Sequence, residues 1–582
     1  MIRKSFFGLL AGMVLCPVFT GCNDFLEEKE IPRLTPDFYG TVPGVDAAAI
    51  SCYSYMRWGV GVGSDLEDTQ RFNVLTEYGT DLFSEGEEPV PWAVAFNRYE
   101  SQLNPEASIL YRLWENHYKA ISVTNLVVQQ VEVSTTMTKA EKELAIAEIS
   151  FLRAYFYFDL VQQFGKIPLV LDVSFSVRTD FPRSPIADIY NQIISDLEYA
   201  VANLKDTPKD GLVGRACIYS AAHLLAKVYL TRGSAVNDIR GQQTTDMGNA
   251  LKYAKMVIDS KKYTLVSNFA DLWAFNNQGN SEGIFVLNFD INEATYNGEG
   301  NGLHWYWGSW YQDVPGMNTR DLENGRPGRT HRQTNKTMLE LFDRKNDSRF
   351  YKSFKWTYYA NNRTDKLQIG DTAIYYSLNP APTGAVYNYT YYAWDKDVPG
   401  NNNRHYPMLL KFLDPGRKSF NDTPGGREWV RMRLGETYLI AAEAAGRNGD
   451  YAAAADYINV IRQRAAWHDD ESKMPQYWRE EGGVKDDTNS TYDLIKVSAS
   501  DLETDFVGFM LDERGRELLG EINRWEDLVR CEKLEEYVKK HNPEAVNIKP
   551  YHKLRPIPQK HIDRLNPRGT IEQEQNEGFT NR

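Results

Sequence analysis

Apolar side chains recur every three or four residues in several long stretches of this chain. In one stretch they occupy Leu144, Ala147, Phe151, Ala154, Phe158 and Val161. This spacing places them on one face of a long helix. Gly165 and Pro168 come next, and both residue types are typical just beyond the end of a helix. The same period returns at 217–228 and 250–257 and predicts two more helices.

The C-terminal part of the chain shows the same period. Apolar stripes at 434–445 and 451–465 flank the short turn RNGD at 447–450. The run GDYAAAADYI resembles the second half of a tetratricopeptide-type (TPR-like) helical hairpin, in which small residues let paired helices approach closely. A last helix is predicted at about 505–531, and its apolar side carries Leu518, Ile522, Trp525 and Val529.

The region at about 265–425 lacks the helical period. It is rich in Asn, Gly, Tyr and Trp, and its apolar runs are short, as in GIFVL at 283–287. We expect loops, short strands and a few helices lying on the helical scaffold. Such segments often carry function, because the scaffold holds them in place.

Composition narrows the class of protein. The 582 residues are 42% apolar and 25% charged, which excludes a disordered or fibrous chain. Sixty-six Lys and Arg against 79 Asp and Glu give a net charge of −13, which argues against a nucleic-acid partner, since phosphates require a basic face. Aromatic residues make up 13% of the chain, and those not on the helical stripes concentrate in the Asn/Gly-rich middle.

The first residues, MIRKSFFGLLAGMVLCPVFTGCN, form a secretory signal. Arg3 and Lys4 precede an apolar run at 6–18 that is too short to span a bilayer. Cys22 follows the small residues Thr20 and Gly21, as in a lipobox, and is predicted to be acylated. No other apolar run approaches the roughly 18 residues of a spanning helix. We therefore expect a protein anchored to a membrane by lipid.

Motifs of catalysis and metal binding are missing from the sequence. Cys52, Cys217 and Cys531 are far apart and follow no ligand spacing, so neither a zinc site nor a disulfide framework is predicted. The chain has no His-Glu-x-x-His, phosphate-loop or Gly-x-Ser-x-Gly pattern. We expect no cofactor and no catalysis, which agrees with a binding protein.

Five segments resemble, in order, the motifs of one family. The first, AEISFLRAYFYFDLVQQFGKIPLV at 147–170, has the acid, the Arg-Ala pair, the Tyr/Phe run and the Phe-Gly-x-Ile-Pro-Leu end of the SusD/RagB family of outer-membrane lipoproteins. The others are GRACIYSAAHLLAKVYL, VRMRLGETYLIAAEAAGRNGDYAAAADYINVIRQRA, LDERGRELLGEINRWEDLVR and KLRPIPQKHIDRLNPRGTIEQEQNEGF. The fourth departs from the family at Gly515, where Arg is usual, and at Ile522-Asn523.

The resemblance implies a mainly α fold, in which TPR-like helical pairs support an irregular, loop-rich ligand-binding region with short strands. It divides the chain into a lipoprotein signal peptide (1–21), a lipidated tether (22–40), an N-terminal TPR-like helical region (41–264) and a C-terminal SusD/RagB region (265–582). The last comprises an irregular ligand-binding part at about 265–425 and a helical part at about 426–582. Charged residues within the motifs are expected to pair and lock helices together: Glu148, Arg153, Asp512, Glu513, Arg514 and Glu517.

The resemblance also implies a function. Members are non-catalytic lipoproteins on the surface of Gram-negative bacteria, bind glycan or in some cases peptide, and act as a lid on a SusC-type TonB-dependent transporter. The expected partners are therefore a glycan, that transporter and the outer membrane.

Candidate site residues come from three aromatic segments. Trp and Tyr suit the flat C–H faces of sugar rings, and the segment GNGLHWYWGSWYQD at 300–313 offers Trp305, Trp307, Trp310 and Tyr311, of which Trp305 and Trp310 are the first choices. The segment at 76–92 resembles one that precedes a ligand-facing loop in the family. It suggests Asp81 as a polar contact or loop anchor and Trp92 as a stacking residue. Trp394, in the aromatic run at 389–394, would either complete the rim of the binding site or pack against neighbouring side chains.

Three other functions stay open at this point. One is a peptide-binding RagB-like uptake lipoprotein, which would rely on backbone pairing. Another is a surface glycoside hydrolase, which requires two carboxylates at a set separation that the sequence does not measure. The third is a scaffold without a small ligand, which burial of all the candidate Trp rings would favour.

Overall fold

The computed structural model of the protein describes most of the chain. The described residues are 35–62, 71–86, 91–235, 237–290, 300–318, 320–325, 331–394, 404–422, 424–468, 471 and 491–580. The predicted lipid attachment site, Cys22, lies outside them. Within these ranges no helix is both long enough and apolar enough to cross a bilayer.

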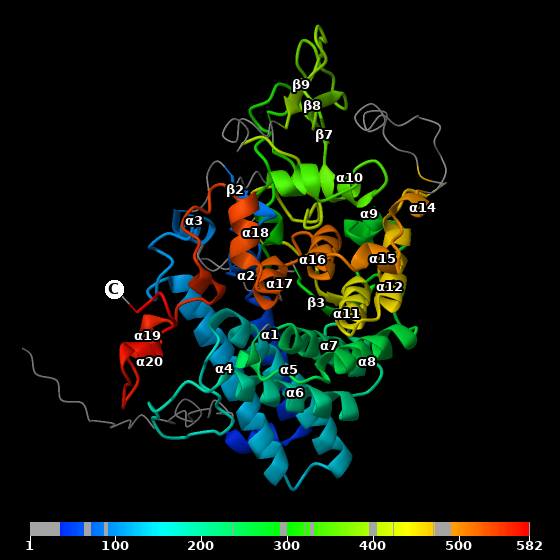
Figure 1. Ribbon diagram of the computed structural model, residues 1–582. Helices are drawn as coiled ribbons and strands as arrows, with labels where there is room; N and C mark the ends of the chain where they lie inside the picture. The colour runs from blue at the N-terminus through cyan, green and yellow to red at the C-terminus, as the bar shows by residue number, and fades with distance from the viewer. Residues whose placement is uncertain are drawn as a thin grey trace, which may run out of the picture.

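Most of the long helices form the lower part of the molecule in Figure 1, and other helices lie in its middle and upper parts. The long ones are α1 (Val42–Arg57), α4 (Ser108–Val133), α5 (Lys139–Phe164), α6 (Ile186–Asn203), α7 (Ile218–Gly233), α8 (Asp246–Asp259), α11 (Leu434–Arg447), α12 (Tyr451–Ala465) and α16 (Phe506–Glu517). The short ones are α2 (Arg71–Thr76), α3 (Pro91–Arg98), α9 (Phe269–Leu272), α10 (Arg349–Ser353), α14 (Tyr492–Ile495), α15 (Ala499–Leu502), α17 (Arg524–Arg530), α18 (Leu534–His541), α19 (Gln559–Ile562) and α20 (Ile571–Glu574).

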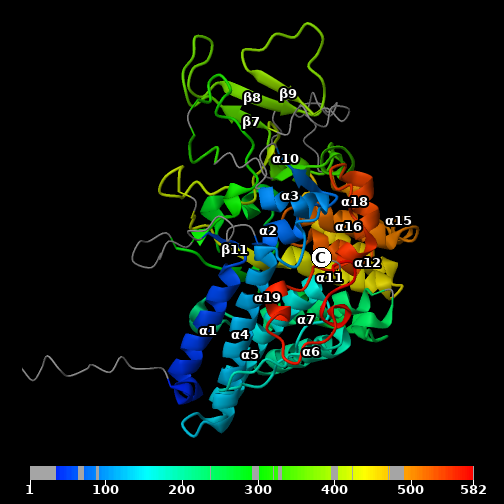
Figure 2. The same ribbon diagram turned by 90° about the vertical axis from the view of Figure 1, so that its left-hand side faces the viewer.

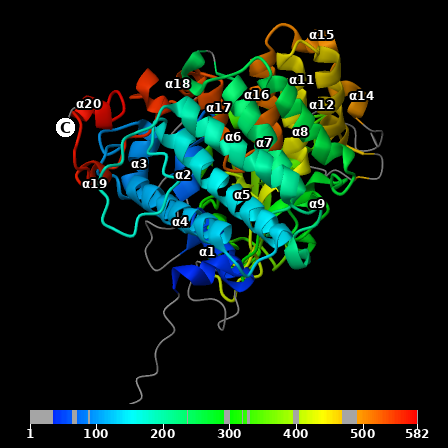
Figure 3. The same cartoon turned by 90° about the horizontal axis from the view of Figure 1, so that it is seen from below.

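The long helices pack side by side in a continuous row. From α4 through α5, α6, α7 and α8 to α11 and α12, each helix contacts the next, although α8 and α11 are far apart in the sequence. Figure 3 shows this row from below. The pairs α7–α8 and α11–α12 confirm the predicted TPR-like packing.

Helix α5 lies second in the row, between α4 and α6, and confirms the helix predicted from the stripe at 144–161. The Thr138 hydroxyl accepts from the backbone N–H of Glu141 and the Glu141 side chain reaches back to Thr138, which caps the first turn. The helix ends at Gly165, whose φ of 69° suits glycine. From Ala145 to Phe164 nearly every side chain is buried, not only the predicted face. The reason is that α4, α6 and α1 all pack against α5.

The irregular region carries short strands, as predicted. They are β3 (Gly283–Leu287), β4 (Gly300–Asn301), β5 (His331–Gln333), β6 (Phe354–Lys355), β7 (Thr357–Tyr359), β8 (Thr372–Ser377), β9 (Thr390–Ala393) and β10 (Met408–Leu409). Three more strands lie outside this region and pair with strands inside it: β1 (Gly61–Val62) with β4, β2 (Phe83–Glu85) with β5, and β11 (Trp429–Arg433) with β3. Strands β7, β8 and β9 form a three-stranded sheet, with β8 antiparallel to β7 and parallel to β9. This sheet lies at the upper end of the molecule in Figures 1 and 2.

The predicted single helix at 505–531 is wrong. Helix α16 ends at Glu517 and α17 begins at Arg524. Between them Gly520 and Ile522 have φ of 75° and 68°, which the right-handed helix does not allow. The break turns the chain so that α17 packs on α2 and α18 as well as on α16.

The charged residues of the family motifs form pairs, as expected, and all of them except Asp512 are buried. Arg153 donates to Asp196 at 2.7 Å and joins α5 to α6. Glu148 pairs with Arg215 at 2.7 Å. Removing one partner of such a buried pair costs about 3–5 kcal/mol, because the other charge stays buried.

The largest of these clusters surrounds Arg349 of α10. This guanidinium is fully buried and reaches Asp347 at 2.7 Å, Glu513 at 2.9 Å and Glu517 at 3.0 Å. Glu517 also pairs with Arg433 at 2.7 Å. The cluster therefore fastens the irregular region to α16 and to β11.

Candidate functional site

The aromatic segment at 300–313 is held at both of its ends by backbone pairing. Strand β4 pairs with β1, and Asn301 also pairs with Gly425 and donates from its side chain to the Arg427 carbonyl at 2.8 Å. A 3₁₀ turn follows at Leu303–Trp305. Further on, the Trp310 N–H donates to the Arg404 carbonyl at 2.9 Å. The backbone of the segment is therefore held at both of these points.

Two of the predicted stacking residues belong to the core. Trp307 is 1% exposed and its ring lies 4.8 Å from Phe83 and 5.0 Å from His331. Tyr311 is 0% exposed, and its hydroxyl donates to the Gly325 carbonyl at 2.6 Å. Neither ring presents a face to a ligand. The predicted stacking role is therefore corrected for both, because the segment buries rings of its own to pack on neighbouring strands: Trp307 on β2 and β5, and Tyr311 on Tyr358 of β7.

Trp305 and Trp310, the first choices, are half-buried. The Trp310 ring lies beside two guanidinium groups, with centroid distances of 5.1 Å to Arg404 and 5.8 Å to Arg320. Arg404 is in turn held by Asp313 at 3.0 Å. An aromatic ring beside guanidinium donors is an arrangement that can offer a ligand both a flat apolar surface and hydrogen bonds.

The structure brings the segment at 300–313 close to residues 391–394 and 404–405. The Tyr392 ring lies between Tyr376 at 5.6 Å and His405 at 4.5 Å, nearly parallel to both. Ser309 and Tyr376 share a hydrogen bond of 3.2 Å. Tyr392 therefore packs within a stack of rings. Packing is one of the two roles predicted for the aromatic run at 389–394. His405 was not singled out from the sequence, although it directly follows the Asn-rich stretch at 401–404.

Trp394 stands at the end of β9, two residues beyond Tyr392, and so shares its side of the strand. Its ring is half-buried, its indole N–H donates to the Asn335 side chain at 2.9 Å, and the Arg332 guanidinium lies 6.0 Å from the ring. The hydrogen bond fixes the ring orientation while part of the ring stays accessible.

Asp81 is an anchor of its loop and not an accessible ligand contact. It is 0% exposed and pairs with Arg524 at 2.6 Å and Lys336 at 3.2 Å. Burial alone would raise its pKa, but the attraction of Arg524 and Lys336 outweighs burial and lowers the pKa to about 2. Of the two roles predicted for Asp81, the structure supports the anchor. Trp92 lies in α3, and its side chain is outside the described residues.

The side chains at this end of the molecule can bind a ligand through rings and polar groups. Among the described residues, no group of three or more His, Cys, Asp or Glu is placed to hold a metal ion. Half-buried rings, guanidinium groups and amides can instead meet a ligand by stacking and hydrogen bonding.

The fold is that of a mainly helical protein with partly exposed aromatic rings in its strand-rich part. The family model described as the SusD family matches residues 240–579, and a second, described as starch-binding associating with outer membrane, matches 68–230. The chain belongs to the SusD family, and the resemblance drawn from the five motifs is confirmed.

Individual relatives agree with this assignment. SusD-like protein P25 of Formosa agariphila is 24% identical over 569 residues, which cover 94% of each chain. The starch-binding protein SusD of Bacteroides thetaiotaomicron is 32% identical over 161 residues, 28% of this chain and 26% of that one.

Solved structures show the same fold. A laminarin-binding SusD-like protein matches with a TM-score of 0.64 at 22% identity, covering 92% of this chain and 99% of the other. Surface glycan-binding protein A of Bacteroides fluxus matches with a TM-score of 0.64 at 19% identity, covering 93% and 100%. The predicted mainly α fold is confirmed.

Proposed function

We propose that the protein is a cell-surface lipoprotein that captures an oligo- or polysaccharide and delivers it to a SusC-like TonB-dependent transporter of the outer membrane. The observation that carries the proposal is the set of half-buried rings Trp305, Trp310 and Trp394 on the strand-rich part of the molecule. Membership in a family described by starch binding and association with the outer membrane supports it.

A glycan suits these rings better than other ligands do. Partly exposed Trp faces stack on sugar rings at a low entropic cost. Arg404, Arg320 and Asn335 stand beside two of these rings and supply donors for hydroxyl groups. The protein acts by binding alone, so it holds the glycan without cleaving it and needs no cofactor.

A RagB-like peptide-binding function is the second candidate. Strand β9 is an edge of its sheet among the described strands, and peptides commonly add a strand to such an edge. The two ligand classes separate in one experiment, because a peptide that pairs with β9 depends on its backbone and little on Trp305 or Trp310.

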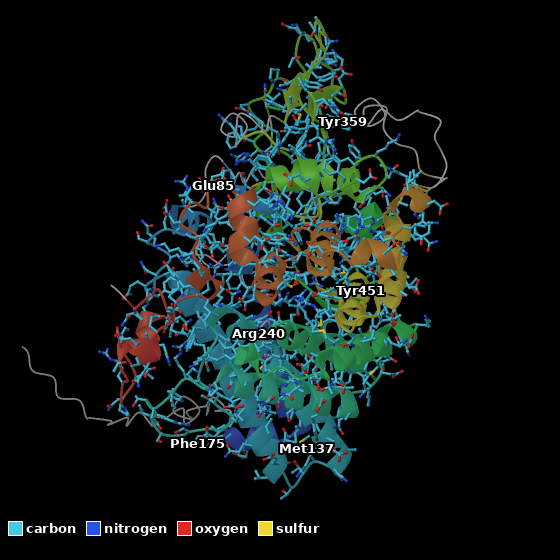
Figure 4. All side chains as sticks on the ribbon, viewed as in Figure 1. Glu85, Met137, Phe175, Arg240, Tyr359 and Tyr451 are labelled. Atoms are coloured by element: carbon cyan, nitrogen blue, oxygen red, sulfur yellow. The ribbon has the colours of Figure 1, made fainter. Side chains whose placement is uncertain are left out.

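The test is calorimetry with the protein lacking residues 1–22, against a panel of neutral polysaccharides and a peptide mixture. Trp305→Ala and Trp310→Ala should each weaken binding of the polysaccharide by roughly 1–3 kcal/mol, about 5- to 150-fold in Kd. Tyr359→Ala is the control: this tyrosine is exposed on β7 of the three-stranded sheet, as Figure 4 shows, and is outside the proposed set.

Unchanged affinity in both Trp variants would refute this site. Binding of peptides and of no polysaccharide would favour the second candidate. Release of reducing sugars from a bound polysaccharide would show that the protein is a hydrolase.

A further inference from the structure

A concave pocket lies far from the aromatic rings described above. It has a volume of about 460 Å³ and opens between α4, the segment 168–181 that follows α5, and the residues around α19. Figure 2 turns this side of α4 and α19 toward the viewer, with the three-stranded sheet at the upper end of the molecule. The volume falls within the range of roughly 300–1,000 Å³ that is typical of small-molecule sites.

Aromatic rings line much of this pocket. Tyr111, Tyr118 and Phe181 are half-buried, while Trp114 is buried beneath them, 5.0 Å from Tyr118. The Tyr118 hydroxyl donates to the Pro168 carbonyl at 2.7 Å, which fixes the ring and ties the segment to α4. The pocket thus offers ring surfaces of defined orientation, as a ligand with flat apolar faces requires.

Most of the charged groups at the rim of the pocket are held in ion pairs. Lys119 pairs with Glu115 at 3.3 Å, and Arg178 pairs with Asp172 at 3.1 Å. Arg564 donates to the Tyr111 hydroxyl at 3.2 Å. Lys119 and Arg178 are thus paired with carboxylates, and Arg564 is engaged by a neutral hydroxyl. The rim therefore carries little net charge and offers donors and acceptors that suit a neutral ligand with many hydroxyl groups.

His561 adds a polar group inside the pocket. Its ring lies 4.7 Å from Trp114, and its Nε2 is buried without a hydrogen-bond partner among the described residues. Burial, helped by Arg183 and Arg564, lowers the pKa of His561 to about 4, so the ring is neutral at pH 7. A buried nitrogen of this kind is stabilised when a hydroxyl of a ligand pairs with it.

We propose that this pocket is a second binding site for a neutral oligosaccharide, in addition to the surface around Trp305, Trp310 and Trp394. The volume suits about two or three sugar units. The proposal extends the proposed function, but the two sites share no residue. A peptide fits this pocket less well, because the α4 wall has its backbone groups bonded within the helix and gives no strand edge.

Two separate sites would change how a long polysaccharide is held. Once one site is occupied, the second binds the same chain at a high local concentration, so the overall affinity exceeds that of either site. Short oligosaccharides that cannot reach both sites would bind each one independently.

The test fills the pocket without touching its aromatic lining. Ser122 is exposed on α4 and lines the pocket, so Ser122→Trp places a large side chain at the opening. Gln129→Trp is the matched control, two turns further along the same helix, exposed and outside the pocket. Ser176→Trp blocks the opposite wall and serves as a second variant if Ser122→Trp fails to fold.

The protein lacking residues 1–22 is first screened on an array of neutral oligosaccharides, and the trisaccharides that bind are measured by calorimetry. We expect two molecules bound per protein. Ser122→Trp or Ser176→Trp should remove the molecule bound in the pocket, and Gln129→Trp should remove neither molecule. The alanine variants of Trp305, Trp310 and Trp394 should remove only the molecule bound at the aromatic rings. His561→Phe should weaken the pocket site by roughly tenfold, the loss of about one hydrogen bond.

The possible results distinguish the two proposals. Binding that survives both blocking variants but is lost in the Trp variants overturns the second site alone. Binding that is lost in the blocking variants but survives the Trp variants supports the pocket and overturns the site around Trp305. Absence of any neutral glycan ligand, or binding of peptides in the pocket, overturns the second site as well.

Discussion

At the scale of single residues, two buried carboxyl groups of one loop have pKa values displaced in opposite directions. Glu77 accepts from the backbone N–H groups of Asn523 at 2.8 Å and Arg524 at 3.3 Å, and burial raises its pKa to about 8. Asp81 is also fully buried, yet Arg524 and Lys336 outweigh burial and lower its pKa to about 2. Asp81 contacts two cationic side chains directly, and this contact explains why its pKa falls while the pKa of Glu77 rises.

Asp81→Asn is expected to destabilise the protein by roughly 2 kcal/mol at pH 7, from about 1.4 kcal/mol per unit of pKa. The folded pKa lies below the unfolded value, so the stability that ionised Asp81 supplies is present above about pH 4 and is lost as the pH falls toward 2. Urea unfolding of both proteins should therefore show a difference at pH 3 about half of that at pH 7. An equal difference at the two pH values would refute the ion-pair explanation.

Glu77→Gln should have the opposite pH dependence. A raised pKa means that the folded protein holds a proton that the unfolded chain releases, so the wild type loses stability as the pH rises from about 4.5 through 8. The Gln variant has no such ionisation. Its stability relative to wild type should improve between pH 5 and pH 8 by on the order of 3 kcal/mol. A constant difference in urea unfolding across this range would contradict the raised pKa.

At the scale of elements, the break between α16 and α17 depends on Gly520. Its φ is 75°, and a Cβ built on it would lie 2.6 Å from Leu409 Cδ2 and 3.3 Å from the Trp307 ring. Gly520→Ala should destabilise by about 2–4 kcal/mol, combining backbone strain with overpacking. Gly449→Ala is the control, because Gly449 has a φ of 86° and no atom near the added Cβ. If both variants lose the same stability in urea unfolding, the contact with Leu409 and Trp307 has no role.

The same break shows why periodicity predicts some elements and misleads on others. Leu518, Ile522, Trp525 and Val529 keep a helical spacing through the break, and all four are buried. Tertiary contacts bury them, so the stripe looks continuous where the helix is not. In α5 the period, the cap at Thr138 and the stop at Gly165 all agree, and the predicted helix is found.

The candidate site was predictable as a region and not ring by ring. Composition places the surplus aromatic residues in the middle of the chain, where the short strands are found. In an irregular segment no period indicates which side chain points inward, so Trp307 and Tyr311 could not be told from Trp305 and Trp310. Only the packing of Phe83, His331 and Tyr358 against the two buried rings separates them.

At the scale of the whole molecule, the start of the described chain lies well away from the aromatic rings. The 3₁₀ turn at Pro36–Gly40 packs on the end of α4, where the Ser134 hydroxyl donates to the Gly40 carbonyl. Figures 1 and 2 place this turn at the lower end and β7–β9 at the upper end. A lipid at Cys22 would therefore attach to the end of the molecule that is remote from the strand-rich part.

This arrangement gives the last prediction, which concerns the anchor and the transporter together. In a Bacteroides host, the wild-type protein should sediment with membranes, be cut by protease added to intact cells and co-purify with a large β-barrel protein. Cys22→Ala should leave the membrane fraction, because stable anchoring requires the acyl chains. Cys52→Ala is the matched control: Cys52 is a buried thiol of α1, and its loss should not change the fractionation.

Membrane association that survives Cys22→Ala would show that the protein is held by something other than its predicted lipid. A β-barrel partner that still co-purifies with the released variant would show that the transporter contact does not depend on the anchor.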